Sequence, residues 1–218
     1  MTKETQQASP EDVLKKIQAF MIEQIKTGAD KFAITARLEE MGVARDQAAD
    51  IVSNFYDDIM RAAKAEAFSS DVMPVAILAA AFAALLGGAI WGALVIFTGY
   101  EVGYVAWGLG LLSGGLVVLA AQGRKGRPLQ IVAVISSLAG IAIGKYVGFH
   151  DALQGYALAE FGAEVAASFT LFSGVVFSLF VENIGSMLGG FDILWVLLAV
   201  ITAWQLPKGM GITPQRLA

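Results

Sequence analysis

Ionisable side chains are rare in the apolar part of this chain, and three of them are candidates for chemistry. Lys145 ends a long apolar run, Glu101 lies in a short turn between two such runs, and Asp192 begins the last run. If these runs are membrane-spanning helices, all three side chains lie at one level of the bilayer, where charged groups indicate function. One hypothesis is a cation or proton site. The alternative is an ion pair that locks three helices, with Lys145 snorkelling to the interface and Asp192 as a helix cap.

The residues that common enzymes and metal sites need are missing. The chain has no cysteine and one histidine, His150, which excludes disulfides, thiolate sites and histidine-rich metal centres. There is no Gly-Lys-Ser/Thr phosphate loop, and the glycine-rich stretch 108–115 lies inside an apolar run. We therefore expect no catalytic residue, no cofactor and no metal, and we expect that the protein is not an enzyme. The net charge of −4 gives no argument for nucleic-acid binding.

Four apolar runs are long enough to position these residues in a membrane. A helix of about 20 residues crosses the ~30 Å hydrocarbon layer, and in lipid each backbone polar group must be paired within its own element. The composition agrees, because 56% of the residues are hydrophobic and only 16% are charged. We predict a transmembrane domain over residues 70–207. Its predicted spans are residues 72–98, 104–121, 129–147 and 190–206.

Loop charges predict the orientation of these spans. The short loop between the second and third spans carries Arg124, Lys125 and Arg127, and short basic loops stay in the cytoplasm. Residues 1–70 and the tail 208–218 are then cytoplasmic as well. The polar N-terminus lacks the apolar core of a cleavable signal peptide. The three cations are also candidate contacts for anionic lipid, although their role in orientation explains them equally well.

The segment 149–189 is expected outside, because it has four acidic residues and no Lys or Arg. Residues 151–161 have the pattern of a short amphipathic helix. Residues 165–181 are 17 apolar residues, at the lower limit for a span. Since a fifth span would place Lys208 outside, we predict a re-entrant or interface-lying segment here, with a fifth span as the alternative.

Small residues recur at every fourth position in the predicted spans, which is typical of helices whose backbones approach closely. We expect a homo-oligomer, but the pattern does not distinguish a contact within one chain from a contact between subunits. The helix-packing candidates are Ala80, Ala84, Gly88, Gly92, Gly110, Gly114, Ser136, Gly140 and Gly144.

The N-terminal part has the pattern of a small soluble domain. Residues 1–9 are polar and predicted to be disordered, and three amphipathic helices follow within residues 10–68. The Met-Gly turn at Leu38–Val43 resembles that of ubiquitin-associated-type three-helix domains, over residues 10–62 at most. This resemblance implies the architecture and no ubiquitin binding. The domain either docks a cytosolic partner or serves as a self-association or solvent-side cap.

Several motifs within residues 85–206 resemble those of uncharacterised bacterial multi-pass inner-membrane proteins. The motifs are Gly99-Tyr100-Glu101-Val102-Gly103, Ala106-Trp107-Gly108, Gly144-Lys145-Tyr146, Phe191-Asp192-Ile193-Leu194-Trp195 and Thr202-Ala203-Trp204. The resemblance implies a four-span bundle in a bacterial inner membrane. It carries no activity.

The sequence thus predicts an all-α polytopic membrane protein, with a four-span helical bundle, an N-terminal cytosolic three-helix domain and an external amphipathic or re-entrant segment. Its expected partners are the lipid bilayer, a second copy, and a cytosolic protein bound through residues 10–68. The first functional hypothesis is a non-enzymatic scaffold or adaptor that oligomerises through small-residue helix faces. The alternative is a small channel or transport accessory with an outer-leaflet site at Glu101, Lys145 and Asp192. A channel needs a polar stripe, and the candidates for it are few: Ser113, Ser136, Ser137 and Thr202.

Overall fold

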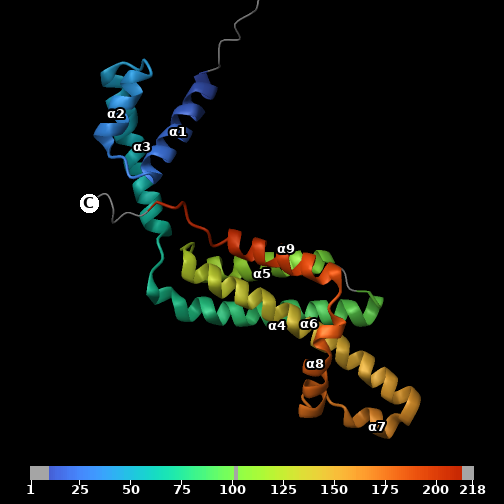
Figure 1. Ribbon diagram of the computed structural model, residues 1–218. Helices are drawn as coiled ribbons and strands as arrows, with labels where there is room; N and C mark the ends of the chain where they lie inside the picture. The colour runs from blue at the N-terminus through green and yellow to red at the C-terminus, as the bar shows by residue number, and fades with distance from the viewer. Residues whose placement is uncertain (1–9, 101–102, 213–218) are drawn as a thin grey trace, which may run out of the picture. The chain divides into compact units, whose positions relative to one another are not determined.

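The computed structural model describes residues 10–100 and 103–212, and these form helices joined by turns and short links, without a β-strand (Figure 1). The all-α prediction is confirmed. The chain divides into two compact units, one of Met1–Ala67 with Gly209–Ala218 and the other of Phe68–Lys208. The disorder predicted for residues 1–9 lies outside the described residues.

The first unit contains three helices, α1 (Pro10–Lys26), α2 (Lys31–Glu40) and α3 (Arg45–Glu66). Asp30 caps α2 by accepting a hydrogen bond of 2.8 Å from the Ala33 N–H. Ile212, from the segment after the last helix, packs against the core of this unit, so the predicted C-terminal tail is in part a component of the domain. The buried residues of this hydrophobic core are Met21, Ile25, Ile34, Leu38, Ala48, Val52 and Tyr56.

The second unit is built around four helices that lie side by side (Figure 1). They are α4 (Met73–Thr98), preceded by the 3₁₀ turn η1 (Ser70–Val72), α5 (Gly103–Ala120), α6 (Arg127–Phe161) and α9 (Gly190–Gln205). Three of these helices are long and apolar enough to cross a membrane, and a bent pair that includes α9 makes a fourth candidate. The protein therefore has the features of a membrane protein with a helical bundle.

Helix α6 differs from the sequence prediction, which ended the third span at residue 147 and began a separate helix at residue 151. It is one helix of 35 residues, about 52 Å long at 1.5 Å per residue and so longer than a hydrocarbon layer is thick. The change from apolar to amphipathic pattern near residue 148 does not interrupt the helix. The helix ends at Gly162, whose φ of 86° lies in the left-handed region that favours glycine.

Two shorter helices fill the segment between α6 and α9. They are α7 (Ala163–Ser168) and α8 (Gly174–Met187), separated by the non-helical link 169–173. Residues 165–181 therefore do not form one unbroken helix. The chain bends by 102° between α8 and α9, as in a broken span or a re-entrant loop.

Candidate functional site

Lys145 of α6 and Asp192 of α9 form a buried ion pair in the second unit. Lys145 Nζ lies 2.8 Å from Asp192 Oδ1, and the two side chains are only 3% and 10% exposed. Lys145 thus does not snorkel to the surface of the unit. Glu101, the third residue of the predicted cluster, lies outside the described residues.

Asp192 also holds the start of α9, although not as the cap that the sequence predicted. Gly189 occupies the cap, and Asp192 is the third residue of the helix. The Gly189 N–H donates to Asp192 Oδ2 at 2.7 Å, while the Asp192 N–H donates to the Gly189 carbonyl at 3.0 Å. The Asp192 carboxylate therefore binds Lys145 and also closes the first turn of α9. The ion pair thus helps to fix the point where the link from α8 enters α9.

Tyr146 and His150 of α6 contact the link between α7 and α8. The Tyr146 hydroxyl donates to the Leu171 carbonyl at 2.6 Å, and His150 Nε2 lies 2.9 Å from the Phe169 carbonyl. Gln154 Nε2 donates to the same Phe169 carbonyl at 3.0 Å. These three side chains are spaced by four residues and share one face of α6. They pair backbone carbonyls that the non-helical link leaves without helical partners.

The nine predicted helix-packing residues are all buried. A Cβ on Gly88 of α4 would lie 2.9 Å from the Gly140 carbonyl of α6, and a Cβ on Gly110 of α5 would lie 2.5 Å from the Ala199 carbonyl of α9. The backbones of both helix pairs are therefore in direct contact. The small residues serve contacts within the chain, which the sequence pattern alone did not distinguish from contacts between subunits.

The serines suggested for a polar stripe lie at helix contacts. The Ser136 hydroxyl donates to the Ala80 carbonyl at 2.6 Å and lies 3.1 Å from the Ser113 hydroxyl, which connects α4, α5 and α6. Among the described residues, the buried Ser137 hydroxyl and Trp91 Nε1 have no hydrogen-bond partner. No group of three or more His, Asp or Glu side chains is placed to hold a metal in the described part of the chain.

The basic loop between α5 and α6 is a tight turn fixed to the end of α9. Gln122 has a left-handed φ of 56°, and the Gly126 N–H donates to the Pro207 carbonyl at 2.9 Å. The Gln130 side chain then donates to the Trp204 carbonyl at 2.8 Å. The cations Arg124, Lys125 and Arg127 therefore lie at the end of the bundle where α5 and α9 end and α6 begins.

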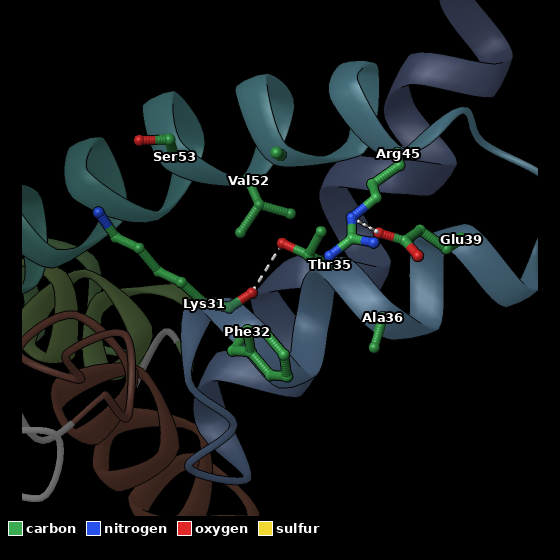
Figure 2. Close-up of a pocket in the computed structure, with 9 residues that line it drawn as sticks. Lys31, Phe32, Thr35, Ala36, Glu39, Arg45, Val52 and Ser53 are labelled. Atoms are coloured by element: carbon green, nitrogen blue, oxygen red, sulfur yellow. Dashed lines mark hydrogen bonds and ion pairs between the residues drawn. The ribbon is translucent and has the colours of Figure 1, made fainter.

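A groove of about 440 Å³ opens between α2 and α3 in the three-helix unit (Figure 2). Phe32 is the most exposed large hydrophobic side chain that lines it, at 80%. This groove was not predicted from the sequence, and the only signal for it is an aromatic residue outside the apolar face of its helix. The lining residues are Lys31, Phe32, Thr35, Ala36, Glu39, Arg45, Ala49, Val52 and Ser53.

Comparisons of the chain with protein-family models, with curated proteins and with solved structures found no match. The resemblances drawn from short motifs therefore stay predictions from the sequence. The geometry of the described residues is what supports a function.

Proposed function

We propose that the protein is a non-enzymatic membrane scaffold or adaptor whose helical bundle anchors it and whose three-helix domain docks a cytosolic protein. The observation that carries this proposal is Phe32, a large aromatic side chain that is 80% exposed beside the groove between α2 and α3. An exposed aromatic group next to an open groove is typical of a surface that binds a protein partner.

The charges around the groove indicate the chemistry of the partner. Arg45 is paired with Glu39 at 3.6 Å, and its side chain is 83% exposed. Lys31 is paired with Asp57 at 2.8 Å, also at the surface. Such exposed pairs contribute about 0–1 kcal/mol and are easily exchanged. We infer a partner segment that packs an apolar side chain against Phe32 and offers a carboxylate to Arg45.

We further propose four spans in a bacterial inner membrane, with both chain ends in the cytoplasm and α7 and α8 outside. The basic loop 121–126 supports this orientation. If α9 crosses the bilayer, a bend of 102° places α8 near the membrane plane. The side chains around α8 fit that position. Val176 and Phe180 are buried against the protein, Phe177 and Val181 are exposed and apolar, and the face of the helix beyond them is polar.

Self-association is the second part of the proposal. An apolar groove of about 350 Å³ lies between α4 and α6, and its lining includes Ile77, Ala81 and Ala139. Small side chains there let the helix of a second copy approach closely, which is the main source of helix association in lipid. The Ser136 hydroxyl at this groove is already hydrogen-bonded inside the chain, so the contact offered to a second copy is apolar.

The alternative function is a small channel or transport accessory. The observation that favours it is the burial of Lys145 and Asp192 in a unit that fits a membrane, since buried charges in membranes are commonly functional. The scaffold is better supported, because the pair also fixes the start of α9 through Gly189 and so has a structural role.

Photo-crosslinking tests the adaptor proposal in living cells. We expect a crosslinking residue at position 32 to give a discrete adduct with another protein, and we expect Arg45→Glu to reduce the amount of that adduct. A crosslinking residue at position 77 tests self-association and is expected to give the homodimer. The control for Phe32 is Leu14, which is 49% exposed in the same unit. The control for Ile77, which is 51% exposed, is Ile90, which is 48% exposed on the same helix and does not line the groove between α4 and α6. Equal labelling at test and control positions contradicts the proposal.

A further inference from the structure

A third groove, of about 460 Å³, lies on the second unit between the last turns of α5 and the residue after α9. We call it the α5–α9 groove. Gly115, Val118, Leu119 and Leu206 form its apolar wall, and Gln122 and Lys125 form its polar end. Three residues of the apolar wall belong to α5, which is long and apolar enough to span a membrane, Leu206 directly follows α9, and the polar end belongs to the basic loop.

Two adjacent glycines show that this groove is built into the bundle. A Cβ on Gly114 would lie 2.9 Å from the Leu206 side chain, so Gly114 lets α5 and the end of α9 meet. A Cβ on Gly115 would meet nothing within 4 Å. Gly115 therefore leaves space on the outer side of the contact that Gly114 makes, and Leu119, 74% exposed, forms the wall one turn further along.

The chemistry of the groove matches a molecule with a long apolar part and an anionic head. The wall offers only aliphatic surface, which suits an acyl chain. Lys125 lines the other end, Arg124 precedes it in the loop, and Arg127 is the first residue of α6. Because α5 ends at Ala120, these cations lie at the depth where phospholipid headgroups meet the end of a span.

We propose that the α5–α9 groove binds one anionic phospholipid, with an acyl chain along Gly115, Val118 and Leu119 and the phosphate at Lys125. This inference rests on the membrane location in the proposed function and does not depend on the adaptor role. It assigns the basic loop a ligand as well as a part in orientation. A bound lipid bridging α5 and the residue after α9 stabilises the end of the bundle, because it binds the folded state only.

The test uses the full chain, purified in a mild non-ionic detergent, with dioleoyl phosphatidylglycerol as the probe. Dioleoyl phosphatidylcholine has the same chains without net charge, and glycerol phosphate has the anionic head without chains. Native mass spectrometry counts the retained lipid, and thermal unfolding reports its stabilising effect. We expect the wild type to retain one phosphatidylglycerol and to gain thermal stability from it, and we expect neither from the other two probes.

Two variants and one control locate the site. Gly115→Leu fills the groove, so retention of phosphatidylglycerol is lost. Lys125→Gln keeps the groove, so affinity for phosphatidylglycerol falls about fivefold, as expected for one cation near a headgroup. Gly108→Leu is the control, because a Cβ there also meets nothing within 4 Å on the same helix, and we expect it to bind as the wild type does.

Several results overturn the inference. One is equal retention of phosphatidylglycerol and phosphatidylcholine by the wild type. Another is competition by glycerol phosphate, which identifies a site for free anions. A third is undiminished binding in Lys125→Gln, which decides the question even if Gly115→Leu fails to fold. None of these measurements involves Phe32 or a protein partner, so a failure of the adaptor proposal is recognised separately.

Discussion

Replacing Lys145 by Met will destabilise the second unit by about 3–5 kcal/mol. The substitution keeps the length of the side chain and removes its charge, which leaves the Asp192 carboxylate in a site where it is 10% exposed. A buried charge without its partner loses the attraction that offset its desolvation. The free energy of unfolding, measured by titrating the protein in mild micelles with a denaturing detergent, gives the size of the effect.

The matched control is the double variant with Lys145→Met and Asp192→Asn. The Asn side chain carbonyl still accepts the hydrogen bond from the Gly189 N–H, so the start of α9 keeps its closed turn. Neither side chain of the pair then carries a charge, and we expect most of the lost stability to return. If Lys145→Met alone is as stable as the wild type but a transport or pH response disappears, the pair is an ion site, and the channel is then the better supported function.

Replacing Gly110 by Ala will destabilise the same unit by at least about 1–3 kcal/mol. The new Cβ would lie 2.5 Å from the Ala199 carbonyl, which belongs to the backbone of α9 and cannot rotate away. Helices α5 and α9 must then separate, and in lipid that separation removes the close packing that holds them together. The measurement is the same unfolding titration.

Gly108→Ala provides the control for this prediction, two residues earlier in α5. Its Cβ meets nothing within 4 Å, so the same chemical change adds no clash, and alanine favours helix over glycine. We expect unchanged or slightly increased stability. Equal losses in the two variants would mean that the contact between α5 and α9 is not close, and that glycine is needed in α5 for another reason.

Helix positions could be predicted from the sequence where apolar runs end at residues that stop helices. Helix α4 ends at Gly99, whose φ of 70° is left-handed, and α1 is followed by Gly28 with a φ of 89°. The third span does not follow this rule. Gly148 lies where its apolar pattern becomes amphipathic, but this glycine is helical, and a Cβ on it would lie 3.1 Å from the Val95 side chain of α4. A change in polarity was read as a helix end, and α6 continues to Phe161.

The candidate site was predictable only in part. Spacing placed Lys145 and Asp192 at one level, because both lie at ends of apolar runs, and the structure brings them together. The role of Tyr146, His150 and Gln154 was not predicted. Their partners are backbone carbonyls of the non-helical link between α7 and α8, and no pattern of residue types reveals the conformation of that link. The groove beside Phe32 was missed for a related reason, since a groove depends on how two helices meet.

The orientation of the chain in the membrane is the central claim, and cysteine accessibility tests it most directly. The chain has no cysteine, so single changes at Asp50, Glu160 and Lys208 can each be labelled with a membrane-impermeant maleimide. The account predicts that Glu160→Cys is labelled in intact cells, and that Asp50→Cys and Lys208→Cys are labelled only after the membrane is permeabilised. Labelling of Asp50→Cys and Lys208→Cys from opposite sides would contradict the account.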